Sequence, residues 1–200
     1  MPVPDNPYTL DEQRTVLWIS RQTLETITQG QEAPFVDLET VTPALREERA
    51  CFVTFRHIDT QELRGCTGTL VAQNPLALEV SIMTVQTALN DPRFQPVQAH
   101  ETHDLHIEVS VLTPMEPLLY IDAFDLVKRI RPNIDGVTLV LGRHRATFLP
   151  QVWERVPDPE KFLSMLSRKM GLSPNAWRQH KMQVFTYQSI VIEESWNHPA

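Results

Sequence analysis

The sequence has 200 residues, of which 42% are hydrophobic, and a formal net charge of −7. This composition allows a hydrophobic core without disulfides or metal, in one domain or one domain with a small lobe. The acidic balance disfavours nucleic acid and anionic membranes as partners of the whole chain, although a local basic patch could still exist. No apolar run approaches the roughly 18 residues that a transmembrane helix needs.

Cysteine usage points to a reducing compartment. The chain has only two cysteines, Cys51 and Cys66, and no charged-then-apolar leading segment, so we expect a cytoplasmic protein. The cysteines lack the spacing of a zinc site, and residues 100–103 lack one spacer of the His-Glu-x-x-His motif. We therefore assign no metal and no cofactor.

The first predicted element is a helix that follows a flexible leader, residues 1–8. Thr9 and Glu12 have the spacing of a capping box, in which each side chain bonds the other residue's backbone amide. Gly30 is a suitable stop. The apolar residues between them keep helical spacing and predict a buried face.

Two strands and a second helix are predicted next. Residues 51–55 are rich in aromatic and β-branched side chains, and a polar turn at 59–62 leads into a strand that begins at Leu63, which together form a plausible hairpin. Asn74 and Pro75 then predict the N-cap and first turn of a helix that continues to about Leu89.

The stretch 63–70, LRGCTGTL, is the first candidate site. Strand alternation places Arg64, Cys66 and Gly68 on one face. A nearby cation favours a thiolate, while Gly65 and Gly68 allow close approach and free backbone amides to point at an anion. The alternative is a buried structural cysteine in a strand weakened by glycine, which is the commoner situation for a free cysteine.

Two further stretches could contribute to this site. Asp91-Pro92-Arg93-Phe94 ends the second helix, and Arg93 could either contact a ligand or pair with Asp91. Residues 103–111 alternate cleanly, which puts His106, Glu108 and Ser110 on one face of a strand. If that face meets Cys66, an imidazole and a carboxylate would supply a base and an orienting group; otherwise this is an ordinary half-exposed strand.

The rest of the chain predicts a short helix over 122–131, with Phe124, Val127 and Ile130 facing inward, and a strand pair over 138–149. A capped helix over 158–170 and a closing strand over 184–192 follow. We therefore expect an α+β fold: a curved antiparallel sheet built from repeated strand-hairpin and helix units, with helices packed outside.

These motifs, taken in order, resemble the AMMECR family, named for the Alport, mental retardation, midface hypoplasia and elliptocytosis chromosomal region. The likeness runs from Ala50 to Glu194, and Thr67 stands where the family usually has Ile, which puts the local strand packing in doubt. The resemblance implies one AMMECR-like domain over 1–200, with a larger and a smaller lobe. The motifs that carry it are LRGC at 63–66, DPRF at 91–94, EVSVLTP at 108–114, IDGV at 134–137, FLPQV at 148–152 and KMGL at 169–172.

The family's activity is not settled, so two functional hypotheses stay open. The chain is similar to protein A of AmmeMemoRadiSam systems, which implies Memo-like and radical-SAM partners. In the first hypothesis it is a thiol-dependent enzyme that modifies a small molecule or protein; in the second it is a ligand-binding or adaptor module without catalysis. In the first, Cys66, Glu108 and His106 are catalytic, and Arg64, Gly65, Gly68, Arg93 and Ser110 bind a small anionic ligand.

Overall fold

A computed structural model describes residues 6–196, and the chain forms two compact units. Among the described residues, unit 1 comprises residues 6–112 and 190–196, and unit 2 comprises residues 113–189. Unit 2 is therefore an insertion in the sequence of unit 1. Residues 1–5 of the predicted leader lie outside the described residues, whereas Tyr8 is buried in the core of unit 1.

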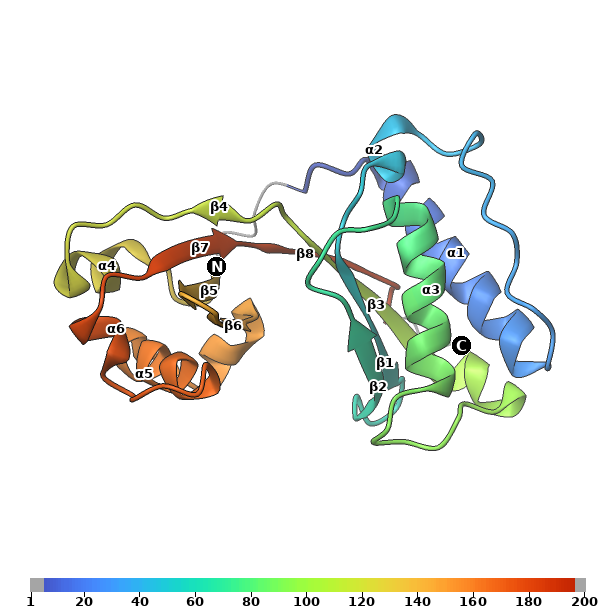
Figure 1. Ribbon diagram of the computed structural model, residues 1–200. Coiled ribbons are helices and arrows are strands. Elements are labelled where there is room, and N and C mark those ends of the chain that lie inside the picture. The colour runs from blue at the N-terminus through green and yellow to red at the C-terminus, as the bar shows by residue number, and fades with distance from the viewer. Residues whose placement is uncertain (1–5, 197–200) are drawn as a thin grey trace. The chain divides into compact units, whose positions relative to one another are not determined.

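Unit 1 is a four-stranded sheet with helices on one face. The strand order is β2-β1-β3-β8, and β1 runs antiparallel to both β2 and β3. The helices α1 and α3 pack against each other and against these strands (Figure 1). Its elements are α1 (Leu10–Thr28), α2 (Pro43–Arg46), β1 (Cys51–His57), β2 (Leu63–Gly68), α3 (Leu76–Leu89), the 3-10 helix η1 (Ala99–Asp104), β3 (Leu105–Leu112) and β8 (Ser189–Glu193).

The capping box at the start of α1 forms as the sequence predicts. The amide of Thr9 donates to Glu12 at 2.8 Å, and the amide of Glu12 donates to the Thr9 hydroxyl at 3.3 Å. Gly30 follows the C-cap with a φ of 77°, a backbone conformation that favours glycine. The start of α3 differs from prediction: Asn74 does not cap the helix but donates its side-chain amide to the buried Glu79 carboxylate at 2.6 Å.

The core of unit 1 lies between the sheet and α1 and α3. Alternate residues of β3, namely Leu105, Ile107, Val109 and Val111, are fully buried in it. The alternation of this strand therefore predicts its inward face correctly, and His106, Glu108 and Ser110 take the opposite face.

Unit 2 has its own antiparallel sheet, with strand order β4-β7-β5-β6, and its own core. The core is centred on Trp153, whose ring stacks on Phe162 with centroids 3.7 Å apart. Its elements are β4 (Glu116–Pro117), α4 (Ala123–Arg129), β5 (Gly136–Leu141), β6 (His144–Phe148), the 3-10 helix η2 (Pro150–Glu154), α5 (Pro159–Lys169), α6 (Ala176–Gln179) and β7 (Gln183–Tyr187).

The predicted α+β class with antiparallel strands is confirmed. The strands divide between two four-stranded sheets where the sequence suggests one, because strand pairing between distant segments leaves no mark in local alternation. Phe124 does not face inward; it is 70% exposed, and Leu126 is the buried residue of α4. In the part of the chain that the structure describes, no helix has the length and apolar character needed to cross a membrane.

Candidate functional site

The register of the unit 1 sheet brings three polar side chains into one row. Thr54 of β1 pairs with Cys66 of β2 on one side and with Glu108 of β3 on the other. Directly opposite residues share a face, so Cys66, Thr54 and Glu108 lie side by side on the face away from α1 and α3. The sequence predicts the face of Glu108, but only the pairing joins it to Cys66.

Cys66 has a hydrogen-bond donor at its sulfur. The Thr54 hydroxyl donates to Cys66 Sγ at 3.3 Å, and Cys66 is partly exposed. Cys51 differs in both respects: it is fully buried, and burial, reinforced by the Glu79 charge, raises the pKa of its thiol. The two thiols also belong to opposite faces of the sheet, since Cys51 packs in the core with Val53 and Phe55.

The cation predicted beside the thiol, Arg64, is engaged elsewhere. The register shifts between Phe55 and Arg56, so Arg64 is the extra residue of a β-bulge. Its guanidinium donates to both oxygens of Glu101, at 2.9 and 3.0 Å, and this pairing lowers the pKa of Glu101. Simple strand alternation predicts Arg64 on the same face as Cys66. The bulge breaks this alternation, so that prediction is wrong.

Arg93 takes the place next to Cys66. Its Nη2 donates to the Cys66 carbonyl oxygen at 2.8 Å. The pKa of Arg93 is raised, first by its hydrogen bond to Asp91 and also by the nearby Cys66 side chain. The sequence leaves open whether Arg93 pairs with Asp91 or contacts a ligand; it pairs, yet its side chain stays 52% exposed.

Asp91 accepts hydrogen bonds from both Cys66 and Arg93. The sequence predicts only its pairing with Arg93. Its carboxylate accepts the Cys66 amide at 2.9 Å and the Arg93 side chain at 2.9 and 2.7 Å. These bonds lower the pKa of Asp91, the Arg93 side chain being the largest cause. Since β2 is an edge strand, Asp91 and Arg93 together satisfy the outward backbone groups of Cys66.

The two glycines of the motif serve packing. A Cβ at Gly65 would lie 3.0 Å from the Thr87 carbonyl oxygen of α3, and one at Gly68 would lie 2.3 Å from the Phe52 ring. The Cys66 amide between them is already bonded to Asp91. These contacts give no support to a bound anion at the amides of residues 65–68, which stays a prediction.

Ser110 and His106 complete the polar face of β3. The Ser110 hydroxyl donates to Glu108 at 3.2 Å. His106 instead belongs to a cluster around the C-terminal strand: its Nε2 lies 2.7 Å from the Glu194 carbonyl oxygen, and its ring stacks on Trp196 with centroids 3.7 Å apart. His106 is paired with Arg56 in the register, two pairs beyond the row of Cys66.

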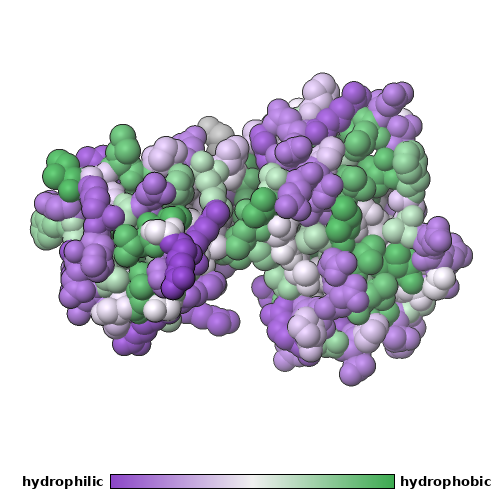
Figure 2. All heavy atoms as spheres, in the orientation of Figure 1, coloured by the Kyte–Doolittle hydropathy of each residue, from purple (hydrophilic) through white to green (hydrophobic). Residues whose placement is uncertain are grey.

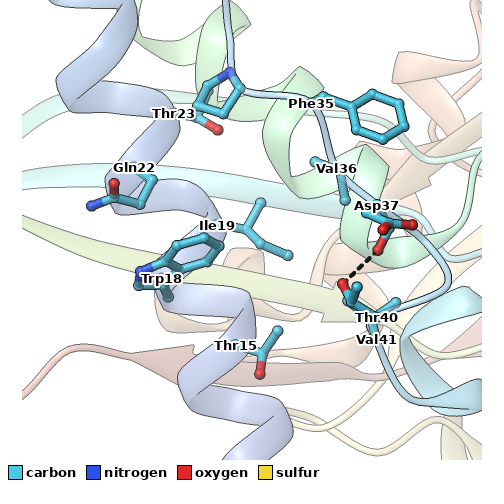
Figure 3. Close-up of a pocket in the computed structure, with 11 residues that line it drawn as sticks. Thr15, Trp18, Ile19, Gln22, Thr23, Phe35, Val36, Asp37, Thr40 and Val41 are labelled. Atoms are coloured by element: carbon cyan, nitrogen blue, oxygen red, sulfur yellow. Dashed lines mark hydrogen bonds between the residues drawn. The ribbon is translucent and has the colours of Figure 1, made fainter.

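Unit 1 also has an apolar groove that contains none of the predicted site residues. Trp18 and Ile19 of α1 form one wall, and Phe35 and Val36 of the following loop form the other, around a cavity of about 280 Å³ (Figure 3). Hydrophobic residues are exposed over this part of unit 1 (Figure 2). The sequence predicts the buried face of α1 but gives no sign that the loop leaves Trp18 uncovered.

Metal ligands do not converge in the described part of the chain. Among residues 6–196, no group of three His, Cys, Asp or Glu side chains is placed to hold a metal ion. The chemistry available around Cys66 is that of a thiol, a hydroxyl, a carboxylate and a guanidinium.

Comparison with known proteins gives the family. The AMMECR1 family model matches residues 17–192. Protein MJ0810 of Methanocaldococcus jannaschii is 30% identical over 93% of this chain and 92% of its own, and a protein of Methanothermobacter thermautotrophicus is 33% identical over 94% and 97%. The crystal structure of the uncharacterized protein PH0010 from Pyrococcus horikoshii matches with a TM-score of 0.75 and 29% identity, over 90% of each chain. The chain therefore belongs to the AMMECR1 family.

Proposed function

We propose that this protein is a thiol-dependent enzyme in which Cys66 is the nucleophile. The observation that carries the proposal is the hydrogen bond from the Thr54 hydroxyl to Cys66 Sγ, at 3.3 Å. A donor at the sulfur stabilises the thiolate, which is the reactive form. Cys66 is a partly exposed residue, and the proposal requires that a substrate reach its sulfur.

Arg93 is the cation of the proposed site. Its Nη2 donates to the Cys66 carbonyl oxygen at 2.8 Å, and the Cys66 side chain is among the causes that raise the pKa of Arg93. Because the Arg93 side chain is half exposed even though it pairs with Asp91, the guanidinium can also donate to an anionic group of the substrate. Arg93 thus takes the role that the sequence suggests for Arg64.

Glu108 is the proton acceptor in the proposal. Two strand spacings separate the Cα atoms of Cys66 and Glu108, about 10 Å, so the carboxylate takes the thiol proton through a bridging water, because the Thr54 hydroxyl already donates its own proton to the sulfur. Ser110 orients Glu108. His106 is a weaker candidate for proton transfer because its Nε2 is already engaged by the C-terminal strand.

The proposed partners are Memo-like and radical-SAM proteins, on the basis of the resemblance to AmmeMemoRadiSam protein A. The site would then act on a small molecule or protein that these partners make or use. The second hypothesis, a ligand-binding or adaptor module without catalysis, is the alternative outcome of the experiment below.

Alkylation of the two cysteines tests the proposal within one molecule. We expect folded protein at pH 7 to react with iodoacetamide at Cys66 at least as fast as the urea-unfolded chain does, while Cys51 reacts about 100-fold more slowly than when unfolded. Peptide mass spectrometry measures both rates. If Cys66 is protected from alkylation until the protein unfolds, it is a structural residue. The hypothesis of a ligand-binding or adaptor module would then be favoured.

Variants of Thr54 test the hydrogen bond that carries the argument. Thr54→Val keeps the shape but removes the donor, so alkylation of Cys66 should slow by roughly tenfold. Thr54→Ser keeps the hydroxyl and should restore most of the rate. Equal rates in wild type and Thr54→Val would remove Thr54 from the mechanism.

A further inference from the structure

The charged residues that line the apolar groove of unit 1 are acidic. The cavity between α1 and the following loop has one charged residue in its lining, Asp37. The same loop lines a second cavity, of about 620 Å³, against α3, and the charged residues there are Asp37 and Glu39. Among the described residues, every charge that lines either cavity is therefore negative.

The side-chain oxygens of the groove are available mainly as acceptors. The hydroxyls of Thr15 and Thr40 each donate to a backbone oxygen at 2.8 Å, so their protons are already used. The Asp37 carboxylate accepts the Glu39 amide through Oδ1 at 2.9 Å. Among residues 6–196 its Oδ2 has no hydrogen-bond or ion-pair partner. A ligand in the groove thus meets an acceptor that carries a negative charge.

Trp18 lines the groove with an aromatic ring that has no cation over it. The residue is 63% exposed, and it lies across the groove from Asp37 (Figure 3). Four rings of unit 2 differ, because each has a Lys or Arg within 5.1 Å of its centroid: Tyr120, Phe124, Phe148 and Trp177. In the described part of the chain no cation takes this position at Trp18, although a Trp ring attracts cations more strongly than Phe or Tyr.

The net charge of unit 1 has the same sign as the groove. Residues 113–189 contain eleven of the 18 Lys and Arg but only seven of the 25 Asp and Glu, so the rest of the chain has a net charge of −11. Arg46 follows the loop, but its guanidinium donates to the carbonyl oxygens of Val41 and Glu39 and lines neither cavity. Because charges beyond about 10 Å are largely screened at about 0.1 M salt, the carboxylates beside the groove contribute most.

We propose that the apolar groove binds a small organic cation, in which a primary ammonium group is attached to an apolar body with a single ring. The apolar body fills the cavity of about 280 Å³. The ammonium group donates to Asp37 and is attracted by the Trp18 ring. Small-molecule sites are commonly apolar cavities in which a few polar groups fix the orientation of the ligand. A cavity of this volume fits one ring, whereas a protein partner would need an interface of about 20 to 30 residues.

Saturation-transfer NMR titrations with three probes test the proposal on the full chain at pH 7. The probes are 2-phenylethylamine, 2-phenylethanol and phenylacetate, which share a phenyl ring but carry a positive charge, no charge and a negative charge. We expect the amine to bind at least about tenfold more tightly than the alcohol, and phenylacetate to bind most weakly. Cys66→Ser should bind the amine as the wild type does, because Cys66 lines neither cavity. Absence of saturable binding by the amine, or equal affinities for amine and alcohol, would overturn the proposal.

Matched variants locate the site. Asp37→Asn keeps an oxygen that can accept the Glu39 amide but removes the charge, so affinity for the amine should fall by about fivefold or more while affinity for the alcohol stays the same. Glu62→Gln removes one charge from an exposed position of the same unit, before β2, and should change amine affinity less than about twofold. Equal losses in the two variants would show a general charge effect and overturn the proposed site.

Trp18→Leu tests the ring. The change keeps an apolar side chain at an exposed position, so affinity for the amine should fall more than affinity for the alcohol. Circular dichroism checks that each variant folds. An equal loss for the two probes would show that Trp18 contributes apolar contact alone and would count against recognition of a cation.

Sedimentation equilibrium separates a ligand site from a contact between two copies of the chain. Phe35 is 90% exposed beside the groove, so Phe35→Asp should leave the fold intact. We expect the same molar mass for the wild type and for this variant. A wild-type dimer that dissociates in Phe35→Asp would assign this face to a second copy and overturn the proposal.

Discussion

Asp91 is the residue on which the local geometry around Cys66 depends. Its side chain is 2% exposed, and it accepts hydrogen bonds from the Cys66 amide and from the backbone and side chain of Arg93. A buried carboxylate with this many donors is stabilised in its charged form. Asp91 therefore fixes the edge strand and aims Arg93 at the same time.

Replacing Asp91 with Asn should lower the free energy of unfolding by about 2 kcal/mol at pH 7, because charged hydrogen bonds are lost in a buried place. Urea denaturation measures this change. The lowered pKa of Asp91 stabilises the fold above the ordinary carboxyl pKa, and the contribution is lost as pH falls. The difference from wild type should be constant from about pH 5 to 7 and shrink below about pH 4.

The exposed Asp104 provides the control for that change. Asp104→Asn should alter the free energy of unfolding by less than about 0.5 kcal/mol at any of these pH values. A deficit in Asp91→Asn that stayed unchanged down to about pH 3 would show that the stabilisation does not come from the charge of Asp91.

At the scale of elements, β2 is shaped by a bulge and by two close approaches. The bulge turns Arg64 toward Glu101, and Gly68 lets the Phe52 ring lie against the strand. A Cβ at Gly68 would also come within 2.5 Å of the Cys51 carbonyl oxygen, which is backbone and cannot move aside cheaply. The glycines of the motif thus set how closely β1, β2 and α3 pack.

Gly68→Ala should destabilise the protein by about 1 to 3 kcal/mol, because the methyl group overpacks the strand pair. Gly65→Ala should cost less, since its nearest contacts, on Thr87, are at 3.0 Å. Chemical denaturation of both variants measures the order. A larger loss in Gly65→Ala would mean that Phe52 and the β1 backbone adjust more easily than α3 does.

At the scale of the whole molecule, the chain has two separate cores. The buried apolar residues of unit 1 and those of unit 2 form distinct clusters. Leu163 of α5 is fully buried in the second cluster, and Ile107 of β3 is fully buried in the first. Local opening of one unit therefore need not expose the core of the other.

Leu163→Ala should destabilise unit 2 by about 2 to 4 kcal/mol and speed hydrogen exchange there by about 100-fold. Amides of β5 and β7 should show the effect, while those of β1 and β3 change little. Ile107→Ala should give the reverse pattern. Mass spectrometry of peptides measures the exchange rates. An equal increase in hydrogen-exchange rate in both units would show that they unfold together.

The sequence by itself determined the local elements and the chemistry that the motifs offer. The capping box at Thr9, the alternation of β3 and the stop at Gly30 depend on residues close together in the chain, so they could be read directly. The α+β class follows from the same local patterns. Composition likewise gave a total charge but no map of where it lies.

Only the tertiary structure decided which residues meet. Strand register places Thr54 between Cys66 and Glu108. A bulge directs Arg64 away from Cys66, and Arg93 lies beside Cys66 instead. Two sheets form instead of one because pairing between distant strands depends on how each core closes. The rings that have a cation over them were distinguishable from Trp18 only once their neighbours were known, since a cation–π contact depends on distance in space.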